Sequence, residues 1–401
     1  APPDLPLAVR LMKELADENP LAAHDLGVLL LKGMGCQADG DEAQRWFQKA
    51  LSGFQQAAST EKKPAYFQYR VGKMHAMGYG VEQDYLEAAL WYERAVQHNN
   101  YPFAAYALGT LYLRGQGVER DEERALELFL TAAEHENQAN AYAMYELGKM
   151  YRRGIGTEID ETKANYWDKM AYNAFVSIEK ARPDDRLQYR LGYMALHGIG
   201  TDPSPETAYF YWKRAVKQHN KDALYALGKL CLDPAFPGFS PQEGEYYLWE
   251  SWEKHQNLQA AYLLGKSYAQ GTVLPQNMEK ALELLATVAE KGNPYAQYLL
   301  GKIYYWGNGV EQDREKGLEY IRQAAEQGHP GAVRFLEHLA QGEQDAYAAS
   351  LFPMATRLLL QVGQIFGRQF NLNPPVARLV DAKLRRKIAE KKLAHGQKLE
   401  M

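Results

Sequence analysis

A pair of glycines recurs along this chain at a nearly constant interval. The first glycine of each pair follows a Leu or Val, and it stands at Gly27, Gly72, Gly109, Gly148, Gly192, Gly228, Gly265 and Gly301. The spacings are 45, 37, 39, 44, 36, 37 and 36 residues. A second glycine follows six residues later in seven of the eight copies, and the sixth copy has Pro234 there. A period of this length is typical of stacked structural repeats, so it constrains the fold more than any other feature.

Each copy also carries the signals of two helices. Twelve residues after the first glycine stands a residue suited to cap a helix N-terminus, in order Asp39, Asp84, Asp121, Asp160, Ser204, Ser240, Asn277 and Asp313. Their side chains can accept hydrogen bonds from the free amides of a first helical turn. Small and apolar residues then recur at spacings of three, four and seven, which predicts one buried helix face.

The first glycine falls inside the preceding helix of each copy. Glycine costs about 1 kcal/mol there relative to alanine, so its recurrence indicates a close contact between the backbones of the two helices. The Gly-x-Gly that ends this helix predicts a left-handed C-cap and a tight turn. A helix pair of this size cannot bury its apolar face alone, and stacking such pairs gives a superhelix.

At Ala104–Asp121 the sequence reads Ala-x-Tyr-x-Leu-Gly-x-x-Tyr-x-x-Gly-x-Gly-Val-x-x-Asp. This pattern resembles the Sel-1-like repeat, a relative of the tetratricopeptide repeat, and the resemblance covers about residues 20–340. It implies an all-α fold, a right-handed α-α superhelix of eight helix-turn-helix repeats, and a role as a protein-interaction scaffold. The departures are the sixth copy, where Asp233–Gly238 replaces the glycine turn, and insertions after the second helix near residues 52–64 and 172–184.

Catalytic and membrane functions find no support in the sequence. The chain has no phosphate-binding loop, dinucleotide fingerprint, zinc motif or nucleophile elbow, so we expect no enzyme, cofactor or metal. No apolar run reaches the roughly 18–20 residues of a membrane span. Cys36 and Cys231 are too far apart in a repeat array to pair, which favours the cytoplasm. The chain starts without Met, so we expect a fragment of a longer protein, or an exported chain whose signal was removed.

A biased surface stripe is the candidate binding site. Tyr occupies the position three residues before the first glycine in seven copies, and Lys the position after the glycine in five. Residues four apart share a helix face, so we expect the first helices to present this stripe along a concave groove. Its members are Tyr69, Lys73, Tyr106, Tyr145, Lys149, Arg153, Tyr189, Tyr225, Lys229, Tyr262, Lys266, Tyr298 and Lys302. An acidic peptide or a nucleic-acid backbone would fit it. The alternative is that the tyrosines pack between helices and the lysines are merely solvated.

The remaining segments divide the chain further. We expect an N-terminal cap at residues 1–20, the repeats at 21–340, a capping helix at 343–370 and a basic tail at 376–401. The tail carries a net charge of +5 against −9 for the remainder. Its basic cluster is Lys383, Arg385, Arg386, Lys387, Lys391 and Lys392. Such a segment is a solvated helical tail, a nucleic-acid contact or a partner-binding helix.

The C-terminal segment carries a second resemblance. Arg357-Leu358-Leu359, Asp381-x-Lys383-Leu384-Arg385-Arg386-Lys387 and Glu390-Lys391-Lys392 look like the end of MOB-P class relaxases of conjugative elements. That family implies an accessory region of a DNA-mobilising protein, whose nicking domain would lie upstream. The leading hypothesis is a non-catalytic scaffold that binds a partner in the groove. The relaxase-associated region and a secreted or periplasmic repeat protein are the alternatives, and the oligomeric state stays open.

Overall fold

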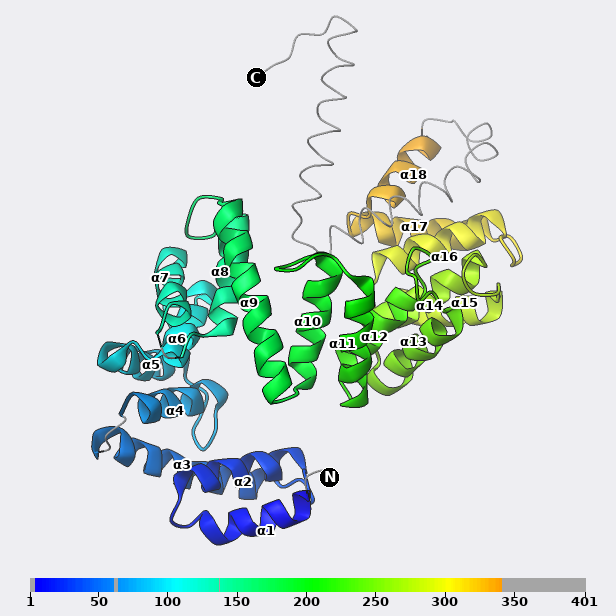
Figure 1. Cartoon of the computed structure of the whole chain (residues 1–401). Coiled ribbons are helices and arrows are strands. Elements are labelled where there is room, and N and C mark those ends of the chain that lie inside the picture. Colours follow the sequence, from blue (N-terminus) through cyan, green and yellow to red (C-terminus); the bar gives the residue numbers. More distant parts are fainter. Residues whose placement is uncertain (1–3, 61–63, 137, 341–401) are drawn as a thin grey trace, which may run out of the picture. The chain divides into compact units, whose positions relative to one another are not determined.

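A computed structural model describes residues 4–60, 64–136 and 138–340. Within these residues every regular element is a helix, as Figure 1 shows from α1 to α18. The chain divides into two compact units, residues 1–178 with 199–202 and residues 179–198 with 203–401. The predicted all-α helix-turn-helix architecture is confirmed, and each unit is described by itself below.

The first unit contains one single helix and four helix pairs. The last pair ends in α9, whose final residues belong to the second unit. The helices are α1 (Leu5–Leu15), α2 (Pro20–Lys32), α3 (Gly40–Thr60), α4 (Pro64–Met77), α5 (Tyr85–Asn99), α6 (Pro102–Arg114), α7 (Glu122–Ala133), α8 (Ala141–Arg153) and α9 (Glu161–Ala181).

The second unit also contains four helix pairs, followed by one single helix. The helices are α10 (Asp185–His197), α11 (Pro205–Lys217), α12 (Lys221–Cys231), α13 (Pro241–His255), α14 (Leu258–Gln270), α15 (Met278–Glu290), α16 (Pro294–Trp306), α17 (Arg314–Glu326) and α18 (Pro330–Ala340). The last of these packs on α17. The predicted capping helix and the basic tail lie outside the described residues.

The N-caps predicted for the second helices are confirmed in every pair. In α7 the side chain of Asp121 accepts a hydrogen bond from the Arg124 amide, and in α11 that of Ser204 accepts from the Thr207 amide. The other six residues make the same contact with amides two or three residues ahead. Each such cap stabilises its helix by about 1 kcal/mol. The predicted left-handed turn glycines are confirmed as well, with φ between 63° and 69° at the end of the first helix in seven pairs.

The glycine inside each first helix lies against the second helix of its own pair. A Cβ added to any of the eight glycines would come within 3.0 Å of one side chain on that helix. These side chains are Phe47, Tyr92, Phe129, Asp168, Trp212, Leu248, Leu285 and Ile321. The expected close contact is therefore confirmed, but its nearest atoms belong to side chains. Backbone carbonyls such as Ala125 O, 3.3 Å from the added atom at Gly109, lie slightly farther away.

The two insertions correct one detail of the sequence interpretation. They were expected to follow the second helix, yet α3 and α9 continue helically through them and reach 21 residues each. The other second helices have 12 to 15 residues. Phe54 and Phe175 on these extensions are completely buried, so the added turns extend the core.

Candidate binding surface

The predicted stripe lies on the first helix of seven pairs. In the first unit α4 carries Tyr69 and Lys73, α6 carries Tyr106, and α8 carries Tyr145, Lys149 and Arg153. In the second unit α10 carries Tyr189, α12 carries Tyr225 and Lys229, α14 carries Tyr262 and Lys266, and α16 carries Tyr298 and Lys302. All seven tyrosines are half-buried, whereas Lys73, Arg153 and Lys229 are exposed.

The tyrosine rings pack between neighbouring helix pairs. Tyr106 lies 5.8 Å from the Phe129 ring of its own pair and 6.0 Å from the Tyr142 ring of the next, measured between centroids. Tyr69 repeats this arrangement, with Tyr92 at 5.8 Å and Phe103 at 6.2 Å. Aromatic pairs at such distances stabilise by about 0.5–1.5 kcal/mol beyond the area they bury. The tyrosines therefore have a structural role in joining successive repeats.

Burial also affects the ionisation of the stripe tyrosines in the second unit. Burial raises the phenol pKa of Tyr225, and the neighbouring Tyr189 raises it further. Burial likewise raises the pKa of Tyr262, with smaller contributions from Tyr295 and Tyr225. For Tyr298, burial raises the pKa to about 12. Burial therefore keeps all of these phenols neutral at physiological pH.

The stripe lysines differ in whether they have an acidic partner. Lys149 in the first unit pairs with Glu146 at 2.6 Å. Among the described residues, no acidic side chain lies within ion-pair distance of Lys229, Lys266 or Lys302 in the second unit. The Lys302 ammonium instead lies over two rings, 5.6 Å from the centroid of Tyr298 and 5.4 Å from that of Trp306. Within the described residues, the second unit thus holds three lysines at one register position that form no ion pair.

The surroundings of these three lysines lower their pKa values. Burial lowers the pKa of Lys302 and of Lys266, and the positive charge of Lys229 lowers that of Lys266 further. Burial also lowers the pKa of Lys229, and Asp233 partly opposes this shift. Protein that surrounds an ammonium group disfavours its charge unless an anion compensates it. A bound anion would remove this penalty.

Two histidines accompany the stripe, and the helix register places only His197, at the end of α10, along it. Burial lowers the pKa of His197 to about 4, with a smaller contribution from Lys229. Burial also lowers the pKa of His329 to about 4. The His329 ring lies 4.8 Å from the Tyr295 ring and 4.6 Å from the Tyr298 ring. His329 precedes α18, so only its contact across helices links it to the stripe, and no local spacing could have revealed that.

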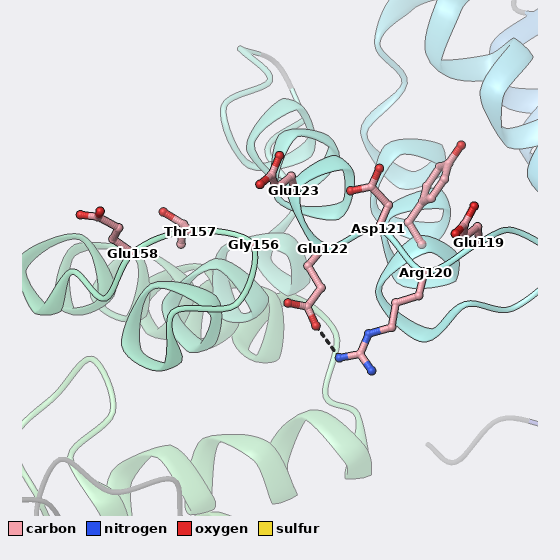
Figure 2. A pocket seen from close by; sticks show the side chains of 9 residues that line it. Glu119, Arg120, Asp121, Glu122, Glu123, Gly156, Thr157 and Glu158 are labelled. Atoms are coloured by element: carbon pink, nitrogen blue, oxygen red, sulfur yellow. Dashed lines mark hydrogen bonds and ion pairs between the residues drawn. The ribbon is translucent and has the colours of Figure 1, made fainter.

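An acidic hollow in the first unit is the other notable feature of the surface. Figure 2 shows it between the start of α7 and the turn after α8, lined by Glu119, Arg120, Asp121, Glu122, Glu123, Gly156, Thr157 and Glu158 together with Tyr112. Arg120 forms an ion pair with Glu122, and Asp121 is the N-cap of α7. Acidic residues in a first helical turn interact favourably with the helix dipole. The start of α7 thus accounts for Glu122 and Glu123, which lie in its first turn.

No group of three or more His, Cys, Asp and Glu side chains within residues 4–340, where described, could hold a metal ion. No helix in the same part of the chain combines the length and the apolar character of a membrane span. Cys36 and Cys231 are both free, and Cys231 is buried.

A model of the Sel1 repeat matches seven segments of the sequence, residues 20–53, 65–100, 102–137, 141–174, 186–220, 258–293 and 294–329. The chain belongs to the Sel1 repeat family. The unmatched stretch between residues 220 and 258 is the sixth pair, whose glycine turn is replaced, yet α12 and α13 pack there as a helix pair. This Sel1 repeat protein therefore has one divergent repeat within a regular array.

Solved structures of the same fold exist. The chain is 27% identical to c5321, a protective antigen of uropathogenic Escherichia coli with an SLR fold, over 85% of this chain and 69% of that one, with a TM-score of 0.53. It is 25% identical to a Sel1 repeat protein from Oxalobacter formigenes, over 82% of this chain and 89% of that one, with a TM-score of 0.46. No curated protein matches the sequence. Neither the family match nor the c5321 structure supports the relaxase resemblance, whose residues lie outside the described part.

Proposed function

We propose that this Sel1 repeat protein is a non-catalytic scaffold that binds an acidic segment of a partner protein. The binding surface is the stripe on α10, α12, α14 and α16. The observation that carries this proposal is the row of Lys229, Lys266 and Lys302, whose charges have no acidic partner among the described residues. Electrostatic complementarity of this kind steers association and selects the partner.

The position of Lys229 supports a concave surface. Its side chain is exposed by surface area, yet burial lowers its pKa. This combination is expected of a lysine on a concave surface. On a concave surface, less water screens the lysine charges. An acidic ligand therefore binds more tightly there than on a flat surface.

Tyrosines and lysines have different tasks in this proposal. The tyrosines hold neighbouring helix pairs together and so set the spacing of the stripe. The lysines contact the partner, because they form no ion pair within the described structure. Replacing a tyrosine is therefore expected to reduce stability first, whereas replacing a lysine reduces binding first.

We place the protein in the cytoplasm, because Cys36 and Cys231 are free and belong to different units. Export is the alternative location, since the similar c5321 protein is a protective antigen. Cell fractionation of the native host, with the full gene product detected by antibody, decides between them.

The binding proposal is tested by reversing charge on the stripe. The triple variant Lys229→Glu, Lys266→Glu and Lys302→Glu is compared with a control triple, Lys217→Glu, Lys254→Glu and Lys291→Glu. The control lysines are exposed, lie at the ends of second helices in the same unit, and change the net charge equally. The probe is fluorescent oligoglutamate, followed by anisotropy at low and physiological salt.

The expected result is a loss of affinity of roughly 100-fold in the stripe variant, at about 1 kcal/mol for each lost ion pair. The control triple should lose less than about 3-fold. Equal affinities of the two triples would refute the stripe as the binding surface. Circular dichroism of both variants verifies that the helices are intact.

A further inference from the structure

The helix α1 has the register of a second helix whose own first helix is not among the described residues. Asp4 caps its start by accepting a hydrogen bond from the Leu7 amide, as Asp84 caps the start of α5. Asp4 precedes the first glycine of the next pair by 23 residues, and the corresponding distance for Asp84 is 25. The helix packs on α2, the first helix of that next pair (Figure 1). The side chains of α1 can therefore be compared position by position with those of the other second helices.

The comparison shows that α1 exposes positions that are covered in the other second helices. Eleven residues after the N-cap residue, the side chain is buried in all eight of them, and seven residues after it none is exposed. In α1 these positions are Leu15 and Leu11, which are 55% and 44% exposed. Leu7, four residues before Leu11, is 40% exposed. Residues at i, i+4 and i+8 share one side of a helix, so the three leucines form an exposed leucine seam.

Two of these leucines do not fit the pattern of a helix pair. Eleven residues after the N-cap residue, six second helices have Ala, and the other two have Ser251 and Val288. Leu15 is larger than all of these and would hold a first helix farther away. Three residues after the N-cap residue, all eight have a polar residue, where α1 has Leu7. A first helix of the usual kind therefore does not account for the leucine seam, which favours a different occupant.

The charged residues beside the leucine seam indicate which occupant fits. At 3.6 residues per turn, Arg10 and Glu14 lie together along one edge of the seam, and Ala8 and Met12 lie along the other. Arg10 and Glu14 are both exposed. Neither forms an ion pair with another described residue, whereas the nearby Lys13 pairs with Glu42. One edge thus offers both a positive and a negative charge, which matches a surface with the same two charges in reverse order.

A second copy of α1 in antiparallel orientation provides that surface. Around a twofold axis at Leu11, Leu7 of each copy faces Leu15 of the other, and the charged edges of the two helices face each other. At about 1.5 Å per residue, Glu14 lies about 4.5 Å along the helix from the twofold axis, and Arg10 of the other copy lies about 1.5 Å along it in the same direction. The two side chains are long enough to meet. In a parallel orientation the charged edge would face the apolar edge instead.

We infer that two copies of this protein associate through α1 in antiparallel orientation, with the leucine seams in contact and Glu14 of each copy paired with Arg10 of the other. Such a contact closes on itself and gives a dimer. One helix of 11 residues from each copy makes a small interface, so we expect dissociation in the micromolar range. The dimer is independent of the proposed function, whose lysines lie on helices of the second unit.

Sedimentation velocity of the full chain over a concentration series tests the association. The variant Leu11→Glu with Leu15→Glu is compared with Leu86→Glu with Leu90→Glu, a matched pair on α5 that is 55% and 41% exposed. Because the first variant would bury charges in the interface, we expect its dimer to be weaker by roughly 30-fold or more. The control should dimerise like the wild type. A wild type that stays monomeric at millimolar concentration, or equal weakening by both variants, overturns the inference.

Charge reversal tests the antiparallel orientation. Arg10→Glu and Glu14→Arg each place like charges opposite one another, so each should weaken the dimer by roughly 5- to 10-fold. The double variant carries the same two charges in exchanged positions and should associate like the wild type. Circular dichroism verifies that the helices of all three variants are intact. A double variant as weak as the single variants contradicts this pairing.

Cysteine cross-linking gives a separate measure of the same geometry. In a Cys36→Ser background, Leu11→Cys should form a disulfide-linked dimer on mild oxidation, because the twofold axis brings the two side chains together. Leu7→Cys should not, since it faces Leu15 of the other copy. Equal cross-linking of both variants would indicate parallel helices. If the wild type instead binds phosphatidylcholine vesicles as a monomer, and Leu11→Glu with Leu15→Glu does not, the leucine seam contacts lipid and the dimer is refuted.

Discussion

In the third and fourth helix pairs, chemically different side chains pack against the glycine of the first helix. In the third pair the Phe129 ring of α7 lies on Gly109 of α6, and Phe129 is completely buried. In the fourth pair the Asp168 carboxylate of α9 lies on Gly148 of α8, and its side chain is 1% exposed. The approach of the helices is equally close in both. The repeat therefore requires a side chain in the space beside this glycine, and a charged side chain can take that position.

The two solutions differ in what they contribute to stability. Phe129 removes apolar surface from water without leaving a polar atom unpaired. Asp168 forms an ion pair with Arg152, yet the Asp168 Oδ1 and the Arg152 Nε have no hydrogen-bond partner. Taking two charges out of water costs several kcal/mol per ion, and their attraction offsets this only with good geometry and full hydrogen bonding. We therefore expect the contact in the fourth pair to be the weaker one.

The largest effect is expected from removing the aromatic contact of the third pair. Phe129→Ala should lower the free energy of unfolding by about 3–5 kcal/mol, because it deletes a fully buried ring and leaves a cavity. Urea denaturation of the full chain, followed by circular dichroism, measures the change. Phe103→Ala is the control, since that ring is 43% exposed and its loss should cost far less. Equal losses for the two variants would contradict the packing role assigned to Phe129.

The fold was predictable because its signals are local. Asp121 marks a helix start by its own hydrogen bond, and Gly115 marks a turn by its backbone conformation. Each acts within a few residues, so spacing alone located the helices. The 21-residue helices α3 and α9 were not predicted, because a helix that continues beyond its repeat carries no end signal at the usual place. Whether their apolar residues find a core depends on contacts across repeats.

The candidate site was only partly predictable. Register placed Tyr225 and Lys229 on one helix face, but it could not show that the tyrosine packs between repeats while the lysine has no acidic partner. That distinction depends on side chains of neighbouring helices. For Asp168 the sequence gives the wrong expectation. A polar side chain is expected to be exposed, yet Asp168 occupies a core position and is buried. Its partner Arg152 lies on the other helix of the pair, 16 residues earlier.

An intermediate effect is expected from breaking the ion pair of the fourth pair. Arg152→Met should lower the free energy of unfolding by about 3 kcal/mol, because it leaves the buried Asp168 charge without a partner. The double variant Arg152→Met with Asp168→Leu should recover this loss or exceed wild-type stability by about 1–4 kcal/mol. Denaturation of the wild type, the single variants Arg152→Met and Asp168→Leu, and the double variant forms a double-mutant cycle. If the double variant is less stable than Arg152→Met, the Asp168–Arg152 ion pair stabilises the fold more than an apolar contact at the same position.

The smallest effect is a difference in pH dependence within α9. Burial raises the pKa of Asp168, and its hydrogen bond with Arg152 opposes this only in part. The folded protein thus keeps the Asp168 proton at pH values where the unfolded chain, with a pKa of about 3.9, has lost it. The stability that Asp168 contributes is therefore present below about pH 4, and it falls as the pH rises through the folded pKa.

Asp160, the N-cap of α9, provides the opposite case in the same helix. The Lys163 amide holds the pKa of its carboxylate below the usual value, so its contribution is present above about pH 4 and is lost as the pH falls. Measured by urea denaturation between pH 3 and 7, the wild type should lose stability relative to Asp168→Asn as the pH rises, and gain it relative to Asp160→Asn. A wild type that gains on both variants would mean that Arg152 outweighs burial. The Asp168–Arg152 ion pair would then offset the cost of its own desolvation, and the fourth pair would be no weaker at this contact than the third.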